Sequence, residues 1–238
     1  MKPILFFTLF FSITVYSFPQ PVFKNPGIPD NESFTIHEYL DTNTGYITSR
    51  VNVSLVQQDN KKYYLIRVNE GDLFINEIKV NYSDLTTISE KRFDVKTKKA
   101  IQYFIRTNDS VRFYNKEKDV YKYIRTDETN IYSPLAYYFS FRGFPFGIGN
   151  SVSFKTYMYA YGGVLTMKLK NVAIKKVTVK TDTYDCYVLE LSVGGWQSVF
   201  APDKYYFYFS VKPPHIFVQY EEKVDGKWRA DEITSYSQ

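Results

Sequence analysis

The side chains that most often perform chemistry are scarce in this chain. Its 238 residues include two histidines, His37 and His215, and one cysteine, Cys186. A Ser-His-Asp triad needs a histidine as general base, but His37 lies in the strand-like run F-T-I-H-E-Y and His215 directly follows two prolines. Both are interpreted as partly exposed strand-end residues. Cys186, within Y-D-C-Y-V-L-E-L, is typical of a small buried strand residue, and as the only cysteine it excludes an internal disulfide.

Carboxylates occur as adjacent pairs at Asp127-Glu128, Glu221-Glu222 and Asp231-Glu232. Adjacent residues of a strand point to opposite faces, so these pairs cannot share a proton as a catalytic dyad. Solvated turn or rim charge is the better interpretation. Metal sites need clusters of His, Cys or carboxylates, and two scattered histidines with one cysteine do not make one. We therefore expect no catalytic residue, no metal and no cofactor, in a protein that is not an enzyme.

A binding site is the other kind of site to consider, and strands are the elements that would position it. Apolar residues alternate with polar ones along most of the chain; Val51 and Val53 share one face, and so do Phe34, Ile36 and Glu38. Aromatic residues make up 19% of the chain, which favours strands because such side chains fit a pleated, half-buried surface. Roughly a dozen strands with hairpin-length connections are expected, and a sheet of that size must curl or split into layers. We predict an all-β fold whose large curved antiparallel sheet forms a half-barrel or barrel.

The strand pattern slips twice in the second half of the chain, near Asn171 and again before Val177 and Val179. Near Asn171 the alternation slips, and Val172 and Ile174 take over the apolar face. A phase slip within a long strand is what a bulge or a tight corner produces. We therefore predict a bulge or corner at this position.

One stretch, from Ile131 to Asn150, carries helix signals instead. Ser133 can cap a helix N-terminus, and Pro134 suits the first helical position because its missing N–H would be unpaired there. Gly143 can close the helix in a left-handed conformation. These signals predict one short helix at about residues 133–142, placed at the mouth of the sheet as a plug.

The candidate ligand-binding residues belong to this plug and to later strands. Phe139 and Phe141 would plug one mouth of the sheet, and Arg142 would be the polar group there, free to meet a headgroup phosphate or carboxylate. Plain core packing is the alternative for the apolar residues, and an ordinary helix C-terminal cation is the alternative for Arg142. The residues predicted to form the pocket wall are Leu165, Met167, Leu169, Phe207 and Phe209.

The N-terminus predicts export. Residues 1–17 resemble a secretory signal peptide: Lys2 supplies the positive start, and Ile4 to Val15 form an apolar run too short to span a bilayer as a helix. Residues 18–32, rich in proline, are expected to form an extended, weakly ordered leader, and residues 33–238 a single β-rich domain. Loss of Lys2 lowers the formal charge from +5 to +4, which gives no reason to expect nucleic acid as a partner. The mature protein is expected to be soluble and either periplasmic or associated with the cell envelope.

Three stretches together resemble an exported bacterial family known as domain of unknown function 3108. They are S-x-L-x-Y-Y-F-x-F-R-x-F-P-F-x-x-G (Ser133 to Gly149), V-T-V-K-T-D-T-Y-D-C-Y-V-L-E-L (Val177 to Leu191) and Y-F-Y-F-S-V-K-P-P-H-I-F-V-Q-Y (Tyr206 to Tyr220), with a weaker match at Asn81 to Arg92. The resemblance implies a curved sheet related to the outer-membrane lipoprotein carriers, wrapped around an apolar cavity, from about residue 33 to the end. Thr183-Tyr184 stands where the family often has glycine, and the first strand lacks the usual glycine-rich entry. The family has no established activity.

The leading hypothesis is an exported, non-enzymatic protein that holds a lipid or other hydrophobic ligand in an apolar cavity of its barrel. One alternative is an interaction or structural protein of the cell envelope, with a filled barrel, no ligand and an envelope protein as partner. An outer-membrane β-barrel is the weaker alternative, because soluble and membrane barrels share a period of two. The sequence leaves ligand identity and oligomeric state open.

Overall fold

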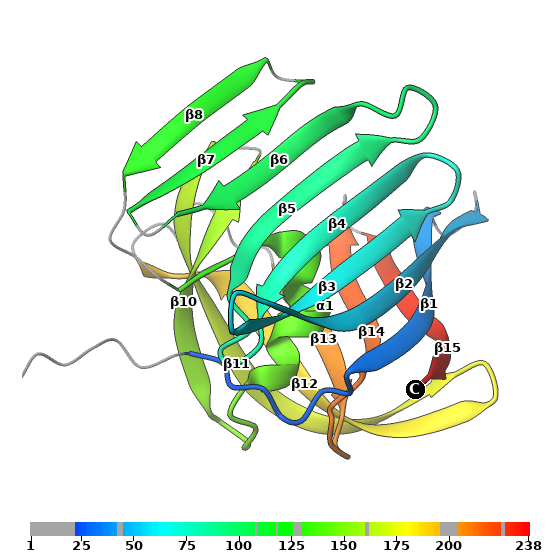
Figure 1. Ribbon diagram of the computed structural model, residues 1–238. Coiled ribbons are helices and arrows are strands. Elements are labelled where there is room, and N and C mark those ends of the chain that lie inside the picture. The colour runs from blue at the N-terminus through cyan, green and yellow to red at the C-terminus, as the bar shows by residue number, and fades with distance from the viewer. Residues whose placement is uncertain are drawn as a thin grey trace, which may run out of the picture.

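The computed structural model describes residues 22–41, 45–107, 109–117, 119–125, 130–159, 162–195, 204–224 and 227–238. The predicted signal peptide, the first residues of the predicted leader and the acidic pair Asp127-Glu128 lie outside the described residues. Within them, the prediction of an all-β fold with one large curved antiparallel sheet and one short helical segment is confirmed (Figure 1).

Fifteen strands are found in the described residues, and they form one sheet. In chain order they are β1 (Asn31–Asp41), β2 (Gly45–Gln58), β3 (Lys61–Glu70), β4 (Phe74–Asn81), β5 (Thr87–Asp94), β6 (Ala100–Arg106), β7 (Ser110–Asn115), β8 (Val120–Arg125), β9 (Ile131–Tyr132), β10 (Ser151–Met158), β11 (Gly163–Val179), β12 (Asp182–Val193), β13 (Tyr205–Ser210), β14 (Phe217–Val224) and β15 (Lys227–Ser237). The spatial order runs from β8 back to β1, then from β15 down to β9. The first and last strands of the chain are therefore neighbours at the middle of the sheet.

Alternation along the strands decides which face is buried. In β4, Asn76, Ile78 and Val80 are buried while the residues between them are more exposed. The β2–β3 register places Val51 opposite Val68, so apolar side chains of neighbouring strands share the inner face. A curved sheet with one apolar face needs a covering element on its concave side.

The helical segment provides that cover. It consists of a 3-10 turn η1 (Pro134–Ala136), the helix α1 (Tyr137–Ser140) and a second 3-10 turn η2 (Phe141–Gly143), and it lies inside the curve of the sheet (Figure 1). The predicted cap is confirmed, since Ser133 Oγ accepts a hydrogen bond from Leu135 N at 3.3 Å and Pro134 occupies the start of the turn.

The predicted left-handed conformation of Gly143 is wrong, since its φ is not positive. Glycine is required there for another reason. A Cβ on Gly143 would lie 2.5 Å from the carbonyl oxygen of Lys24, closer than real Cβ contacts come. The backbone of the N-terminal segment passes directly over this residue, and Lys24 N donates to Gly143 O at 3.0 Å.

The predicted boundary between leader and domain is also wrong. Strand β1 begins at Asn31, and the residues before it pack into the core: Phe23 is fully buried and Ile28 is 3% exposed. The Phe23 ring contacts Tyr132 and Phe141 at centroid distances of 4.7 and 5.5 Å. These two apolar anchors bind the described part of the leader to the domain.

The predicted irregularity near Asn171 is confirmed as a register shift between Asn171 and Ala173 in the β11–β12 pair. The prediction that Val172 and Ile174 take over the apolar face is wrong, because these side chains are 37% and 48% exposed. Strand β12 instead changes the face that it buries at this point, from Leu189 to Val188. The bulge therefore bends the hairpin without moving the apolar face of β11.

Candidate ligand-binding pocket

A pocket of about 380 Å³ lies between the helical segment and the inner face of the sheet. This volume falls in the range of small-molecule sites, roughly 300–1,000 Å³. The strands that contribute to it are β1, β3 and β10 to β15, so the β1–β15 neighbourhood brings both ends of the chain to one site. Its lining residues are Ile36, Glu38, Val68, Glu70, Pro134, Leu135, Tyr137, Tyr138, Met158, Met167, Leu191, Tyr205, Phe207, Phe217, Tyr220 and Asp231.

The helical segment forms one wall through Pro134, Leu135, Tyr137 and Tyr138. Tyr137 is held in place by a hydrogen bond from its hydroxyl to Thr156 Oγ1, and its ring stacks on Phe141 at 4.5 Å. The wall is therefore supported from behind by aromatic packing, which favours a pocket that exists before a ligand arrives.

The predicted binding residues separate into two groups. Met167 and Phe207 line the pocket, as predicted. The other apolar residues, which do not line it, are packed within the hydrophobic core or against it: Leu165, Leu169, Phe209, Phe139 and Phe141.

Phe139 and Phe141 fill space rather than guard an opening. Phe139 contacts the ring of Tyr64 at 5.2 Å, and Phe141 lies 5.5 Å from Phe154 and 5.1 Å from Phe207. Phe207 lines the pocket on its other side. The helical segment thus fills part of the interior of the sheet, and its other side forms a wall of the pocket.

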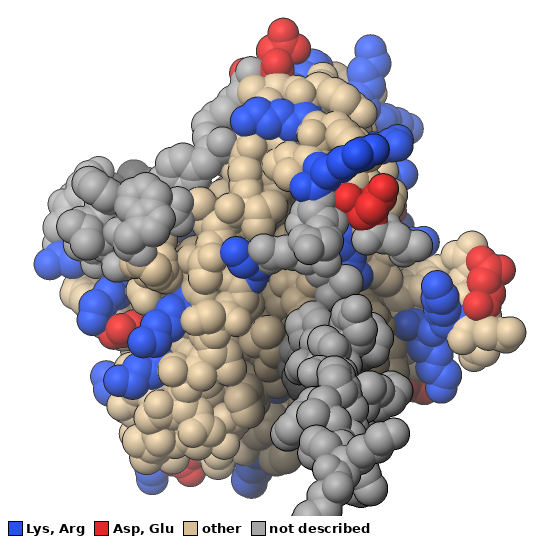
Figure 2. Space-filling view, turned by 90° about the vertical axis from the view of Figure 1, so that its left-hand side faces the viewer, with Lys and Arg blue, Asp and Glu red and all other residues tan. Residues whose placement is uncertain are grey.

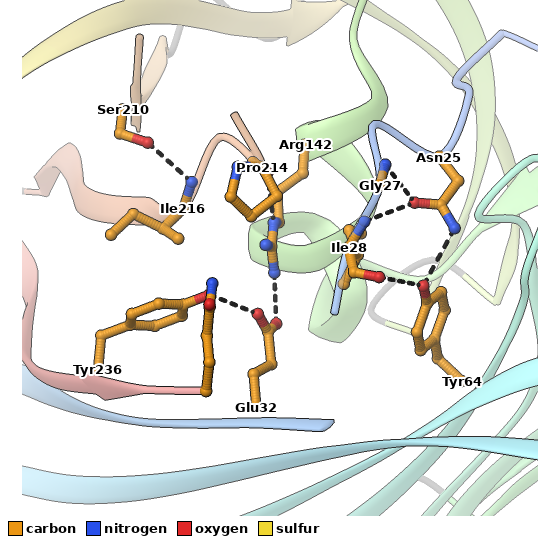
Figure 3. Close-up of polar contacts among 11 residues, drawn as sticks. Asn25, Gly27, Ile28, Glu32, Tyr64, Arg142, Ser210, Pro214, Ile216 and Tyr236 are labelled. Carbon is orange, nitrogen blue, oxygen red and sulfur yellow. Dashed lines mark hydrogen bonds and ion pairs between the residues drawn. The ribbon is translucent and has the colours of Figure 1, made fainter. Parts of the chain in front are cut away.

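Arg142 does not line this pocket and is only 2% exposed. Its Nη1 pairs with Glu32 Oε1, its Nε donates to Pro214 O at 3.0 Å, and Tyr236 donates to the same carboxylate at 2.9 Å (Figure 3). A guanidinium already paired with a buried carboxylate is poorly placed to receive an anionic headgroup. The pairing could not be foreseen because Glu32 lies far away in the sequence, on the first strand.

Sequence reasoning missed the polar end of the pocket, formed by Glu38, Glu70 and Asp231. Glu38 and Asp231 are direct partners across the β1–β15 pair. Glu70 is opposite Ser49 in the β2–β3 pair, and the Ser49 hydroxyl donates to Glu38. We call these three carboxyls the acidic end. The inward position of Glu38 could be predicted, since it continues the buried face of Phe34 and Ile36. The pairing of its strand with β15, which brings Asp231 next to it, could not.

Each carboxyl of the acidic end has a different environment. Glu70 accepts hydrogen bonds from Arg92 Nη2 at 2.6 Å and Asn76 Nδ2 at 2.5 Å. Asp231 accepts one from the backbone N–H of Tyr39 at 3.2 Å, and Arg229 Nε is 3.9 Å away. Among the described residues, Glu38 has the Ser49 hydroxyl as its hydrogen-bond donor and forms no ion pair.

Burial shifts the titration of these groups. It raises the pKa of the Asp231 carboxyl to about 7, while Arg229 acts in the opposite direction. It also raises the pKa of Glu38, against the hydrogen bond from Ser49, which lowers it. Burial together with the nearby Glu38 and Glu70 raises the pKa of the Tyr138 hydroxyl well above its usual value. The Glu38 and Asp231 carboxyls are therefore costly to ionise, as isolated buried carboxyls are.

The interpretation of Asp231-Glu232 as rim charge is wrong for Asp231, which faces the pocket.

The two histidines are involved in aromatic contacts: His37 stacks on Tyr46 at 3.9 Å, and His215 packs on Phe146 at 4.3 Å. Burial lowers the pKa of both rings. Cys186 is buried, and burial raises the pKa of its thiol to about 12, so it is a poor nucleophile.

Neither a metal-binding cluster nor a membrane-spanning helix is found in the described part of the chain. No three His, Cys, Asp or Glu side chains come together there as they would around a metal ion. None of the helical turns described has the length and apolar character that a membrane-spanning helix requires.

The fold and pocket define a barrel-like all-β protein with an open sheet edge on either side and a pocket in its interior. No family model and no curated protein matches the sequence. One solved structure that is similar is a beta-barrel-like protein of domain of unknown function DUF1849 from Brucella abortus. The match covers 87% of this chain and 97% of that one, at 8% sequence identity and a TM-score of 0.45. These comparisons do not support the predicted resemblance to domain of unknown function 3108 or to the lipoprotein carriers.

Proposed function

We propose that this protein is an exported, non-enzymatic binding protein that holds a lipid or other hydrophobic ligand in the interior pocket. The observation that carries the proposal is the pocket itself: about 380 Å³ of space with mainly apolar walls, in an interior that is otherwise packed. Apolar side chains that stay in contact with water are unfavourable, and the apolar walls of this pocket are reached by water-sized molecules. An apolar ligand would cover those walls.

The alternatives differ in what the interior and the outer face should look like. A filled barrel is favoured by the buried rings of Phe139, Phe141 and Phe23, which occupy much of the concave side. This alternative does not account for the pocket. An outer-membrane barrel needs an apolar outer band, whereas the outward positions of β2 to β5 include the exposed Arg50, Arg67 and Lys91. The proposed export rests on the signal-like residues 1–17 alone.

The experiment is to extract protein purified from its native envelope and to search the extract for bound lipid by mass spectrometry. The same protein is then titrated with decanol in a calorimeter. Met167→Trp places a large ring at the pocket wall and should reduce binding at least about tenfold, because it occupies ligand space. Val172→Trp, on the exposed outer side of the same strand, is the matched control and should leave binding unchanged.

Binding of lipid or decanol that Met167→Trp weakens and Val172→Trp does not would support the proposal. If native protein carries no lipid and takes up no apolar probe, the proposal fails. A stoichiometric protein recovered from crosslinked envelopes, without lipid, would favour the envelope-interaction alternative.

A further inference from the structure

The pocket is amphipathic, with its polar groups at one end. Thirteen of its sixteen lining residues are apolar or aromatic, and the three that are charged, Glu38, Glu70 and Asp231, are all acids. No Lys, Arg or His occurs among the described lining residues. On the outer face shown in Figure 2, by contrast, Lys and Arg side chains outnumber Asp and Glu side chains. The charged groups of the acidic end are therefore opposite in sign to the net charge of the chain, which is positive.

The basic groups near the acidic end already lie beside carboxylates, although the Nε of Arg229 has no hydrogen-bond partner. Arg92 is bound to Glu70 at 2.6 Å and lies over the Phe74 ring, 4.1 Å from its centroid. Arg229 forms ion pairs with two carboxylates: its Nε lies 3.9 Å from Asp231 Oδ1, and its Nη1 lies 3.5 Å from Glu222 Oε1. Glu38 is left without an ion pair among the described residues. Two basic residues therefore lie beside four carboxyls, those of the acidic end and Glu222, so ionisation of all four would leave negative charge in excess.

A neighbouring buried amide, outside the lining of the pocket, has an acceptor without a donor next to Glu70. Asn76 is 1% exposed, and its Nδ2 donates to Glu70 Oε1 at 2.5 Å. Its Oδ1, the other end of the same amide, has no hydrogen-bond partner. Flipping the amide would turn its oxygen toward the carboxylate, so the assignment of the two atoms is fixed by the contact. Glu38 and Asp231, which do line the pocket, each accept one hydrogen bond, from the Ser49 hydroxyl and from Tyr39 N respectively, so both have oxygens left to accept further donors.

We propose that the ligand is a cationic amphiphile, whose apolar body fills the pocket and whose protonated amine donates hydrogen bonds to Glu38 and Asp231. This inference rests on the proposed binding function and names the chemistry of the ligand. An ammonium group is compact, carries three donors and one positive charge, and so supplies both the donors and the charge that the acidic end lacks.

Other ligand classes fit less well. A fatty acid would bring a second carboxylate against Glu38 and Asp231, and like charges disfavour each other's ionised forms. A neutral alcohol offers one donor and no charge. A bare metal ion would need several ligands converging at short distances, and the described carboxyls do not form such a group.

Three probes of equal chain length test the inference on the unaltered protein: decylamine, decanol and decanoate. They are titrated by calorimetry at pH 8, where the amine is protonated, since amines of this kind have a pKa near about 10. Hydrogen bonds to charged groups are stronger than neutral ones, so decylamine should bind about tenfold or more tightly than decanol, and decanoate should bind most weakly.

Substitutions then locate the amine. Glu38→Gln and Asp231→Asn should each remove most of the advantage of decylamine over decanol while leaving decanol binding unchanged. Glu77→Gln, an acid on the outer face of β4 that pairs with the exposed Arg67, is the matched control and should change neither. The comparison of the three probes decides the question even if a variant does not fold.

The outcomes separate this inference from the proposed function. Equal or tighter binding of decanol or decanoate overturns the cationic ligand and leaves the apolar pocket as a binding site. An advantage of decylamine that survives both substitutions also overturns it, because the amine then lies elsewhere. Failure of all three probes to bind overturns the proposed function as well.

Discussion

Glu38 and Asp231 lie directly opposite each other across the β1–β15 pair and line the same pocket. Burial raises the pKa of the Asp231 carboxyl, and the nearby Glu38 raises it further. Their position joins the first strand of the chain to the last, so the acidic end exists only when the sheet is complete. Unfolding and ligand binding should therefore both respond to the ionisation of this pair.

The first prediction concerns stability against pH. The pKa of Asp231 rises from 3.8 to about 7 on folding, so the folded state holds this proton more tightly than the unfolded state. The free energy of unfolding should therefore fall as pH rises from about 4 to about 7. Asp231→Asn cannot ionise and should gain on the order of 2 kcal/mol relative to the unaltered protein at pH 8, with little difference at pH 4.

Urea unfolding of both proteins across this pH range measures the difference. Asp94→Asn is the control with the opposite sign, because hydrogen bonds from Thr97 lower the pKa of Asp94 in an exposed turn. A constant difference between the unaltered protein and Asp231→Asn at every pH would contradict the raised pKa.

The second prediction concerns the buried ion pair of Arg142 and Glu32, whose side chains are 2% and 0% exposed. Arg142→Met leaves Glu32 as an uncompensated buried charge and should lower the free energy of unfolding by about 3–5 kcal/mol. Adding Glu32→Gln should recover much of that loss. Removing the exposed Arg67 from its 3.9 Å pair with Glu77 should cost about 0–1 kcal/mol.

The same variants test what Arg142 does. If the residue acts structurally, the folded double variant binds decanol and decylamine as the unaltered protein does. Loss of binding with little loss of stability would instead return Arg142 to the role of a headgroup receptor, which was predicted from its place at the mouth of the sheet.

The third prediction concerns Gly143. An alanine Cβ there would lie 2.5 Å from Lys24 O and 2.8 Å from Lys24 N, both backbone atoms that cannot rotate away. Gly143→Ala should displace the N-terminal segment, lower stability by about 1–3 kcal/mol and speed tryptic cleavage after Lys24. Gly163→Ala, with nothing within 4 Å of its Cβ, should change neither. Equal cleavage rates in the two variants would show that the segment is not held by this contact.

Local signals predicted local structure well in this chain. The alternation of strands, the Ser133–Pro134 start of the helical segment and the irregularity at Asn171 each depend on residues that are close in sequence. The predictions that failed depend on contacts between segments that are distant in the sequence. The role of Gly143 follows from the passage of Lys24, and the pairing of Arg142 follows from Glu32 on the first strand.

The candidate site shows the same division. Met167 and Phe207 were predicted from apolar alternation and do line the pocket, but alternation cannot tell a pocket wall from a packed core, as Leu169 and Phe209 show. Asp231 was assigned to the rim because only its sequence neighbour Glu232 was compared with it. Its partner Glu38 is set by the β1–β15 register, a contact that local patterns do not encode.

The fourth prediction concerns the plug. Phe141 is fully buried and stands behind two pocket residues, Tyr137 at 4.5 Å and Phe207 at 5.1 Å. Phe141→Ala should cost about 3–5 kcal/mol of stability because it opens a cavity in the core. Since that cavity adjoins the pocket wall, the variant should bind bulkier apolar ligands than the unaltered protein does.

Phe104→Ala provides the comparison, because Phe104 is equally buried but belongs to a separate cluster with Phe113 and Tyr157. It should lose similar stability without any change in the size of ligand accepted, as measured by calorimetry with a series of alcohols of increasing bulk. If Phe141→Ala also leaves that size limit unchanged, the ring only fills the core. A raised size limit would mean that the plug sets the dimensions of the pocket, which is what its position between core and pocket wall requires.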